Sequence, residues 1–172
     1  EKIMGLLGET KPVKKPILGV SLYPEQESME EIENYLTMAS RYGFTKIFTS
    51  MFSVPDTKEE VFDYFKNFCD LAHKHGMKVS GDCNTAFFKK MGASESDISI
   101  FKEMGIDIIR MDLPYFDQRD VTLINNPYNI TIELSSCMIQ AVRMALENGA
   151  NPKNFSTCHN FYPERYTASD LE

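Results

Sequence analysis

A recurring unit of an apolar segment, an amphipathic helix and a glycine constrains the fold of this chain more than any other feature. Helices are expected in four stretches, at residues 29–39, 61–72, 98–103 and 139–147. A glycine follows each stretch, at positions 43, 76, 105 and 149. Glycine is favoured there because the residue after a helix often adopts the left-handed backbone conformation. The pattern therefore predicts helices that each end at a glycine.

Six apolar segments flank these helices and are predicted to be strands. They span residues 17–24, 44–53, 77–84, 106–115, 130–137 and 155–162. Successive strand–helix units predict a parallel sheet with right-handed crossovers, either an open doubly wound sheet or a (β/α)8 barrel. The segment YPEQES stands where a dinucleotide-binding fold would have a glycine-rich phosphate loop. We therefore expect an α/β fold of the TIM barrel type.

The number of strands indicates how much of a barrel the chain contains. A (β/α)8 barrel takes about 250 residues, whereas this sequence has 172. We expect residues 17–172 to form a partial barrel domain with about the first six strands, the rest of the barrel being absent from this chain. Residues 1–16 mix Gly, Lys and Pro without a clear period, and we expect a flexible leader or linker there.

Charge and composition argue against several classes of partner and site. The formal net charge of −7 disfavours nucleic acid and anionic membrane surfaces, because both would require a basic face. No apolar run approaches the roughly 20 residues of a membrane helix, and no signal peptide is evident. The cysteines lie far apart without a CxxC pair, so we expect reduced thiols, no metal site and a cytoplasmic location.

Alternation along the predicted strands places a set of polar side chains on the inner face of the barrel. The active sites of such barrels lie at the C-terminal ends of the strands. Asp82, Asp112 and Glu133 are then three carboxylates at one mouth, with Arg110 among them. Such groups can hydrolyse glycosides, bind a divalent metal or abstract a proton next to a carbonyl, and the pattern leaves these open. A purely structural ion pair of Arg110 fits the pattern equally well.

Seven segments, in order and at comparable spacing, resemble one protein family. They run from about Ile17 to Thr167 and read ILGVSLYPE, YGFTKIFTS, FFKKMG, IIRMDL, NNPY, IELS and CHNFYPERYT. Together they resemble the bacterial 6-phospho-N-acetylmuramidases, a former domain of unknown function that is sometimes labelled outer surface protein. The last segment is the most specific of the seven.

This resemblance implies a function as well as a fold. It implies an N-terminal (β/α)8 barrel followed by a cyclophilin-like domain, which is absent from this chain. It also implies a cytoplasmic glycosidase that cleaves 6-phospho-N-acetylmuramyl-N-acetylglucosamine to N-acetylmuramic acid 6-phosphate and N-acetylglucosamine during cell-wall recycling. The expected partner is therefore a small phosphorylated amino-sugar disaccharide, and no cofactor is implied.

The alternation and the resemblance together assign roles to individual residues. We expect Glu133 to act as acid/base with Asp112 as its partner and Asp82 as a third candidate, although the substrate's 2-acetamido group could replace the partner carboxylate. Arg165 suits a phosphate or the lactyl carboxylate because its guanidinium is a planar fork, and an exposed surface arginine fits equally. The remaining predicted substrate-binding residues are Tyr23, Ser50, Asn84, Arg110, Ser135, His159, Asn160 and Tyr162.

Two departures from the family pattern keep other functions open. The segment DCNT at 82–85 has threonine where the family usually has proline, and Ser135 stands where the family tends to have asparagine. A barrel with these changes could bind a sugar phosphate without cleaving it. A metal-dependent aldolase or isomerase that uses the three carboxylates as oxygen ligands is the other alternative.

Overall fold

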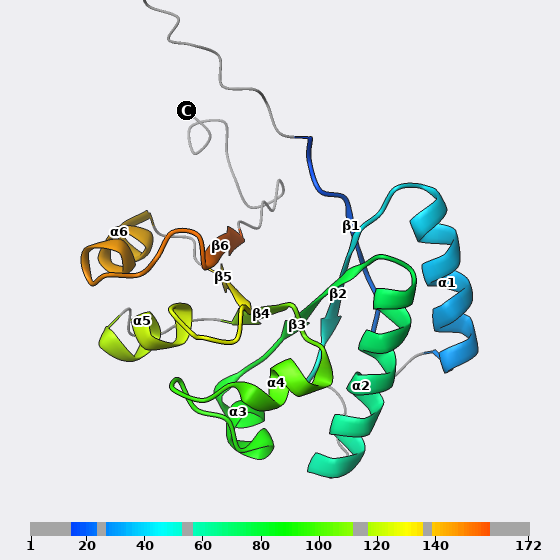
Figure 1. The fold of residues 1–172 in the computed structure, drawn as a ribbon, viewed down its shortest axis with the longest axis horizontal. Helices are drawn as coiled ribbons and strands as arrows, with labels where there is room; N and C mark the ends of the chain where they lie inside the picture. Colours follow the sequence, from blue (N-terminus) through cyan, green and yellow to red (C-terminus); the bar gives the residue numbers. More distant parts are fainter. Residues whose placement is uncertain (1–14, 24–26, 53–56, 112–116, 136–138, 159–172) are drawn as a thin grey trace, which may run out of the picture.

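The computed structural model describes residues 15–23, 27–52, 57–111, 117–135 and 139–158, which form one sheet and its surrounding helices (Figure 1). The strands are β1 (Gly19–Ser21), β2 (Lys46–Ser50), β3 (Lys78–Asp82), β4 (Ile108–Met111), β5 (Thr131–Ser135) and β6 (Phe155–Cys158). The helices are α1 (Met29–Arg41), α2 (Lys58–Lys74), α3 (Thr85–Met91), α4 (Ser99–Met104), α5 (Gln118–Ile124) and α6 (Ile139–Glu147).

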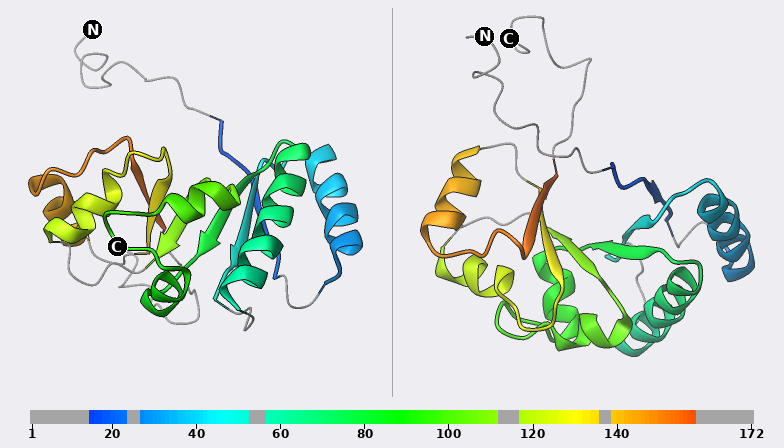
Figure 2. Two further views of the ribbon diagram at one scale, coloured as in Figure 1. Left: turned by 60° about the horizontal axis from the view of Figure 1, so that its bottom comes forward. Right: turned by 45° about the horizontal axis from the view of Figure 1, so that its top comes forward.

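The strands lie in the sheet in the order of the chain, from β1 to β6, and every neighbouring pair is parallel. The helices surround the convex side of the curled sheet (Figure 2). A doubly wound sheet would carry helices on both faces and reverse its strand order. The structure therefore confirms the predicted partial TIM barrel.

The two longest helices, α1 and α2, begin with the capping boxes that their sequences contain. The Glu31 backbone N–H donates to Ser28 Oγ at 3.3 Å, and the Ser28 backbone N–H donates to Glu31 Oε2 at 2.8 Å. Thr57 and Glu60 make the same pair of contacts at the start of α2. Hydrogen bonds from Ser28 lower the pKa of Glu31. These contacts satisfy backbone groups that a helix end leaves unpaired, and they fix where each helix starts.

Two short helices, α3 and α5, lie outside the stretches in which the sequence predicts helices. Each has seven residues, fewer than two full turns. Their start signals are the side chains of Asn84 and Asp117, which accept hydrogen bonds from the backbone N–H groups of Phe87 and Arg119. A polar cap without the rest of a capping box did not distinguish these helices from loops.

The core lies between the outer face of the sheet and the helices. Ile47 and Val79 pair in register, as do Ile109 and Ile132, and all four are fully buried. Phe65 and Phe68 of α2 and Phe101 of α4 are fully buried as well. The apolar parity of the strands thus faces the helices, as predicted, and the polar parity is left for the inner face.

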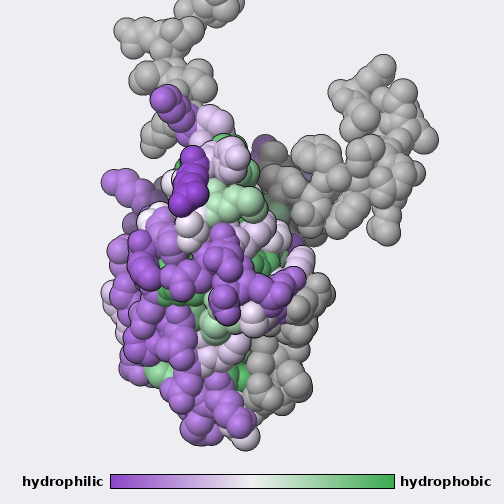
Figure 3. Space-filling view, turned by 90° about the vertical axis from the view of Figure 1, so that its right-hand side faces the viewer, coloured by the Kyte–Doolittle hydropathy of each residue, from purple (hydrophilic) through white to green (hydrophobic). Residues whose placement is uncertain are grey.

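Figure 3 shows mainly hydrophilic side chains on the side of the molecule that α1 forms. Within the part of the chain that the structure describes, no helix combines the length and apolarity that a membrane crossing needs.

Two cysteines, Cys69 and Cys83, are buried, and their thiols should react more slowly than that of the partly exposed Cys158. Burial raises the pKa of Cys69, helped by Asp107, and burial also raises the pKa of Cys83, helped by Asp82. Because the thiolate is the reactive form, iodoacetamide at pH 8 should modify neither residue until denaturant is added. Peptide mass spectrometry checks this, with the partly exposed Cys158 as the internal control. Rapid labelling of Cys69 or Cys83 in the native protein would contradict the packing described here.

Candidate active site

The inner face of the curled sheet carries an open cleft of about 670 Å³. Side chains of all six strands reach it, because alternate residues of a strand point to opposite faces. On β2, for example, Lys46, Phe48 and Ser50 line the cleft, while Ile47 and Thr49 between them are buried. The full lining consists of Ile17, Gly19, Val20, Ser21, Tyr23, Lys46, Phe48, Ser50, Phe52, Asp82, Arg110, Glu133 and Cys158.

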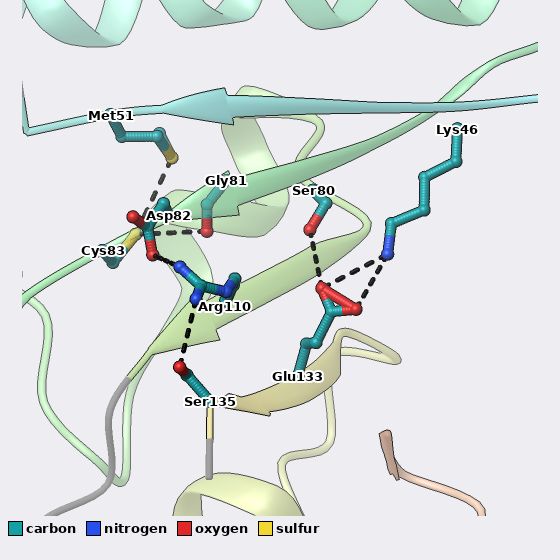
Figure 4. Close-up of polar contacts among 9 residues, drawn as sticks. All are labelled: Lys46, Met51, Ser80, Gly81, Asp82, Cys83, Arg110, Glu133 and Ser135. Carbon is teal, nitrogen blue, oxygen red and sulfur yellow. Dashed lines mark hydrogen bonds and ion pairs between the residues drawn. The ribbon is translucent and has the colours of Figure 1, made fainter. Parts of the chain in front are cut away.

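Arg110 is the centre of one polar cluster in the cleft (Figure 4). Its Nη1 donates to Asp82 Oδ1 and its Nη2 donates to Ser135 Oγ, both at 3.0 Å. The guanidinium carbon also lies 5.6 Å from the centroid of the Phe48 ring, which is within the range of a cation–π contact. Burial lowers the pKa of Arg110, but Asp82 and Cys158 raise it by more, so the pKa lies above its ordinary value. The structure thus holds this guanidinium in one place at the strand ends.

Glu133 is the centre of a second polar cluster. Lys46 Nζ donates to both of its carboxylate oxygens, at 2.9 Å and 3.2 Å, and Ser80 Oγ donates to Oε2 at 3.4 Å. The Lys46 side chain is 26% exposed and the Glu133 side chain 12% exposed. The ion pair is therefore largely shielded from solvent, yet both residues line the cleft.

The two clusters form two layers of the barrel interior. Glu133 is in register with Arg110, Asp82 and Ser50, but its contacts are with residues that come earlier on β2 and β3. Such an offset is expected because barrel strands tilt, so side chains at one height come from different register positions. We call Asp82, Arg110 and Ser135 the upper layer, and Lys46, Ser80 and Glu133 the lower layer. The strand arrows in Figure 4 point toward the upper layer, which therefore lies nearer the C-terminal ends of the strands.

The structure brings several of the predicted site residues together. Tyr23, Ser50, Asp82, Arg110 and Glu133 line the cleft, and Ser135 binds Arg110. Five predicted residues lie outside the described part of the chain, so their positions stay predictions: Asp112, His159, Asn160, Tyr162 and Arg165.

Asn84 has a different environment from the other predicted substrate-binding residues. Its Oδ1 accepts a hydrogen bond from the Phe87 backbone N–H at 2.8 Å, which caps α3. It is not among the residues that line the cleft. The side chain therefore has a structural partner, and its contact with a substrate stays a prediction.

Three residues of the two clusters were not selected from the sequence: Lys46, Phe48 and Ser80. The signal for Lys46 was present, since this charged residue has the same parity in KIFTS as Ser50, which was predicted to bind the substrate. Ser80 likewise shares its parity with Asp82.

The described residues contain no group of three or more His, Cys, Asp or Glu side chains placed to hold a metal ion. Each of the two cleft carboxylates instead contacts a cation from the protein, Asp82 with Arg110 and Glu133 with Lys46. The arrangement offers carboxylates, a guanidinium, an ammonium and hydroxyls, which are groups that hydrogen-bond sugar hydroxyls.

The parallel curled sheet and the polar cleft on its inner face define a protein of the (β/α) barrel class. Residues 18–172 match the family described as 6-phospho-N-acetylmuramidase, N-terminal, and the chain belongs to this family. Comparison with curated proteins gave no match.

Solved structures show the same fold. An uncharacterized B. cereus protein is 33% identical with a TM-score of 0.70, over 89% of this chain and 40% of its own. A conserved Enterococcus faecalis protein of unknown function is 20% identical with a TM-score of 0.67, over 86% of this chain and 40% of its own. A Thermobaculum terrenum O-GlcNAc hydrolase mutant is 12% identical with a TM-score of 0.51, over 84% of this chain and 40% of its own. The chain thus spans 40% of the length of each of these proteins.

Proposed function

We propose that this chain supplies part of the active site of a cytoplasmic 6-phospho-N-acetylmuramidase, which acts in cell-wall recycling. The substrate would be 6-phospho-N-acetylmuramyl-N-acetylglucosamine, and the products N-acetylmuramic acid 6-phosphate and N-acetylglucosamine. The observation that carries this proposal is the presence of two carboxylates, Asp82 and Glu133, in one cleft of a member of this family.

The chemistry of the cleft suits glycoside hydrolysis. In that reaction a carboxylic acid protonates the leaving oxygen as its bond to the anomeric carbon breaks, and water finally adds to that carbon. Glu133 would be the acid/base, and the second function would come from Asp82, Asp112 or the substrate's own 2-acetamido group. Arg110, Tyr23 and Ser50 would bind sugar hydroxyls, and Arg165 would hold the phosphate or the lactyl carboxylate.

Turnover by the purified full-length protein tests this proposal. Incubation with the phosphorylated disaccharide should release N-acetylglucosamine, and EDTA should leave the rate unchanged, because no step uses a metal ion. Chromatography of the two products measures the reaction. Release that EDTA abolishes would contradict this metal-free hydrolysis. A metal-dependent aldolase or isomerase would instead release no N-acetylglucosamine and would convert a sugar phosphate only when a divalent metal is present.

The ion pairs of the cleft favour a second candidate, a barrel that binds a sugar phosphate without cleaving it. Arg110 contacts Asp82 at 3.0 Å and Lys46 contacts Glu133 at 2.9 Å, so both described cleft carboxylates have cationic partners. Calorimetry that shows binding of the disaccharide, without any release of N-acetylglucosamine, would favour this candidate over the hydrolase.

A further inference from the structure

The side chain of Lys46 reaches across the inner face of the sheet. Lys46 is the first residue of β2, and Glu133 lies on β5, so that β3 and β4 stand between them in the sheet. The contact joins residues that are 87 positions apart in the chain. Only the curled shape of the sheet brings the two side chains together, because residues three strands apart in a flat sheet would lie about 14 Å apart.

The contacts of Lys46 fix the carboxylate of Glu133. The ammonium donates to both carboxylate oxygens, and the Ser80 hydroxyl supports one of them. A glutamate side chain has several rotatable bonds, and these three hydrogen bonds together select one orientation. Among the described residues, the ammonium hydrogen-bonds to Glu133 alone, so its contacts serve this carboxylate.

The burial of this pair separates it from the other lysine ion pairs. Lys66 and Asp70 on α2 are 47% and 62% exposed, and Lys74 and Glu33 are 66% and 43% exposed. Exposed pairs of this kind contribute little to stability. Lys46 and Glu133 are 26% and 12% exposed, so the cost of removing their charges from water is larger. An apolar pair would fill the barrel interior without that cost, which points to a use for the ionised pair at the cleft.

We propose that Lys46 is a positioning residue, which holds the carboxylate of Glu133 in the orientation that the reaction requires. This inference rests on the proposed glycosidase function. Lys46 acts through Glu133. A carboxyl group that must contact the glycosidic oxygen reacts faster when it is held in the right orientation before the substrate binds. The lysine transfers no proton and forms no bond with the sugar.

Substitution of Lys46 in the full-length protein tests the inference. Lys46→Met should lower kcat on the phosphorylated disaccharide about a hundredfold, the size of effect that misplacing a catalytic group by about 1 Å produces. KM should stay within about threefold, because positioning acts on the chemical step. Lys46→Arg keeps the cation and should recover most of the lost kcat. Lys74→Met removes an exposed lysine of another lysine–glutamate pair and should leave both constants unchanged.

A double-mutant cycle with Glu133→Gln distinguishes positioning from an independent effect. If Lys46 acts through Glu133, the double variant should be about as slow as Glu133→Gln alone. Losses that multiply would overturn the inference, as would a raised KM with unchanged kcat. Thermal unfolding shows whether each variant is folded, and Lys46→Gln carries the same comparison if Lys46→Met does not fold.

The wild-type protein separates this inference from the proposed function. If the wild type and Lys46→Met turn over the substrate equally fast, the positioning role of Lys46 is wrong and the proposed function stands. A folded wild type that releases no N-acetylglucosamine overturns the proposed function and, with it, the role of Lys46.

Discussion

Glu133→Gln is expected to lower the turnover of the full-length protein on the phosphorylated disaccharide by about 10²- to 10⁴-fold, the range that general acid–base catalysis contributes. Glutamine keeps the size of the side chain but cannot give or take the proton. The loss should appear in kcat, with KM little changed, because the substrate's binding contacts remain. Initial rates of N-acetylglucosamine release at several substrate concentrations measure both constants.

The control for this substitution is Glu103→Gln, which changes an exposed glutamate of α4 in the same way and should leave turnover unchanged. Glu133→Gln also leaves the Lys46 ammonium without its counter-charge, so the variant should be less stable. Its thermal unfolding must therefore be recorded, and kcat referred to the folded fraction. Unchanged turnover in folded Glu133→Gln would remove Glu133 from the catalytic role.

The depth of Glu133 in the barrel makes a comparison with Asp82 informative. Glu133 lies one layer below Asp82 and Arg110, while barrel active sites open at the C-terminal ends of the strands. In a closed barrel, a substrate that enters at the strand ends would pass the upper layer on its way to Glu133, and that layer would then hold its sugar. If Asp82→Asn loses turnover and Glu133→Gln keeps it, the reaction takes place in the upper layer. The Glu133–Lys46 pair would then lie beneath the substrate and have a structural role.

The fold was predictable because its signals are local. The apolar stretches at 29–39 and 61–72 predicted α1 and α2, and Gly76 marked the end of α2. The alternation of side chains along a strand predicted a polar inner face and an apolar outer face, and the buried Ile47 and Val79 lie on that outer face. Repeated strand–helix units then left few topologies, and the absence of a phosphate loop favoured the barrel.

The contacts within the candidate site were not predictable, because alternation gives the face of a residue but not its partner. Glu133 was expected near Arg110, its neighbour in register, yet its oxygens contact Lys46 and Ser80. That choice depends on how far the strands tilt and the sheet curls, which are properties of the whole sheet. Asn84 had the same parity as Asp82, but the start of an unpredicted helix gave it a local partner.

Gly105→Ala is expected to destabilise the barrel by more than Gly149→Ala. Gly105 follows α4 with φ of 92°, and a left-handed conformation costs alanine about 1–2 kcal/mol. An added Cβ would also lie 2.9 Å from Cys69 Cβ on α2. That atom is attached to the helix backbone and cannot rotate away, so relief requires α2 and α4 to separate, and overpacking of this kind costs about 1–3 kcal/mol.

Gly149→Ala is the matched control for this substitution. Gly149 has nearly the same φ, 95°, but an added Cβ there would meet nothing within 4 Å. It should therefore show the conformational cost alone. Denaturant unfolding of both variants gives their free energies of unfolding, and we expect Gly105→Ala to lose about 1–3 kcal/mol more than Gly149→Ala, the cost of the added contact. Equal losses would mean that α2 and α4 do not pack as closely as the Gly105–Cys69 contact requires.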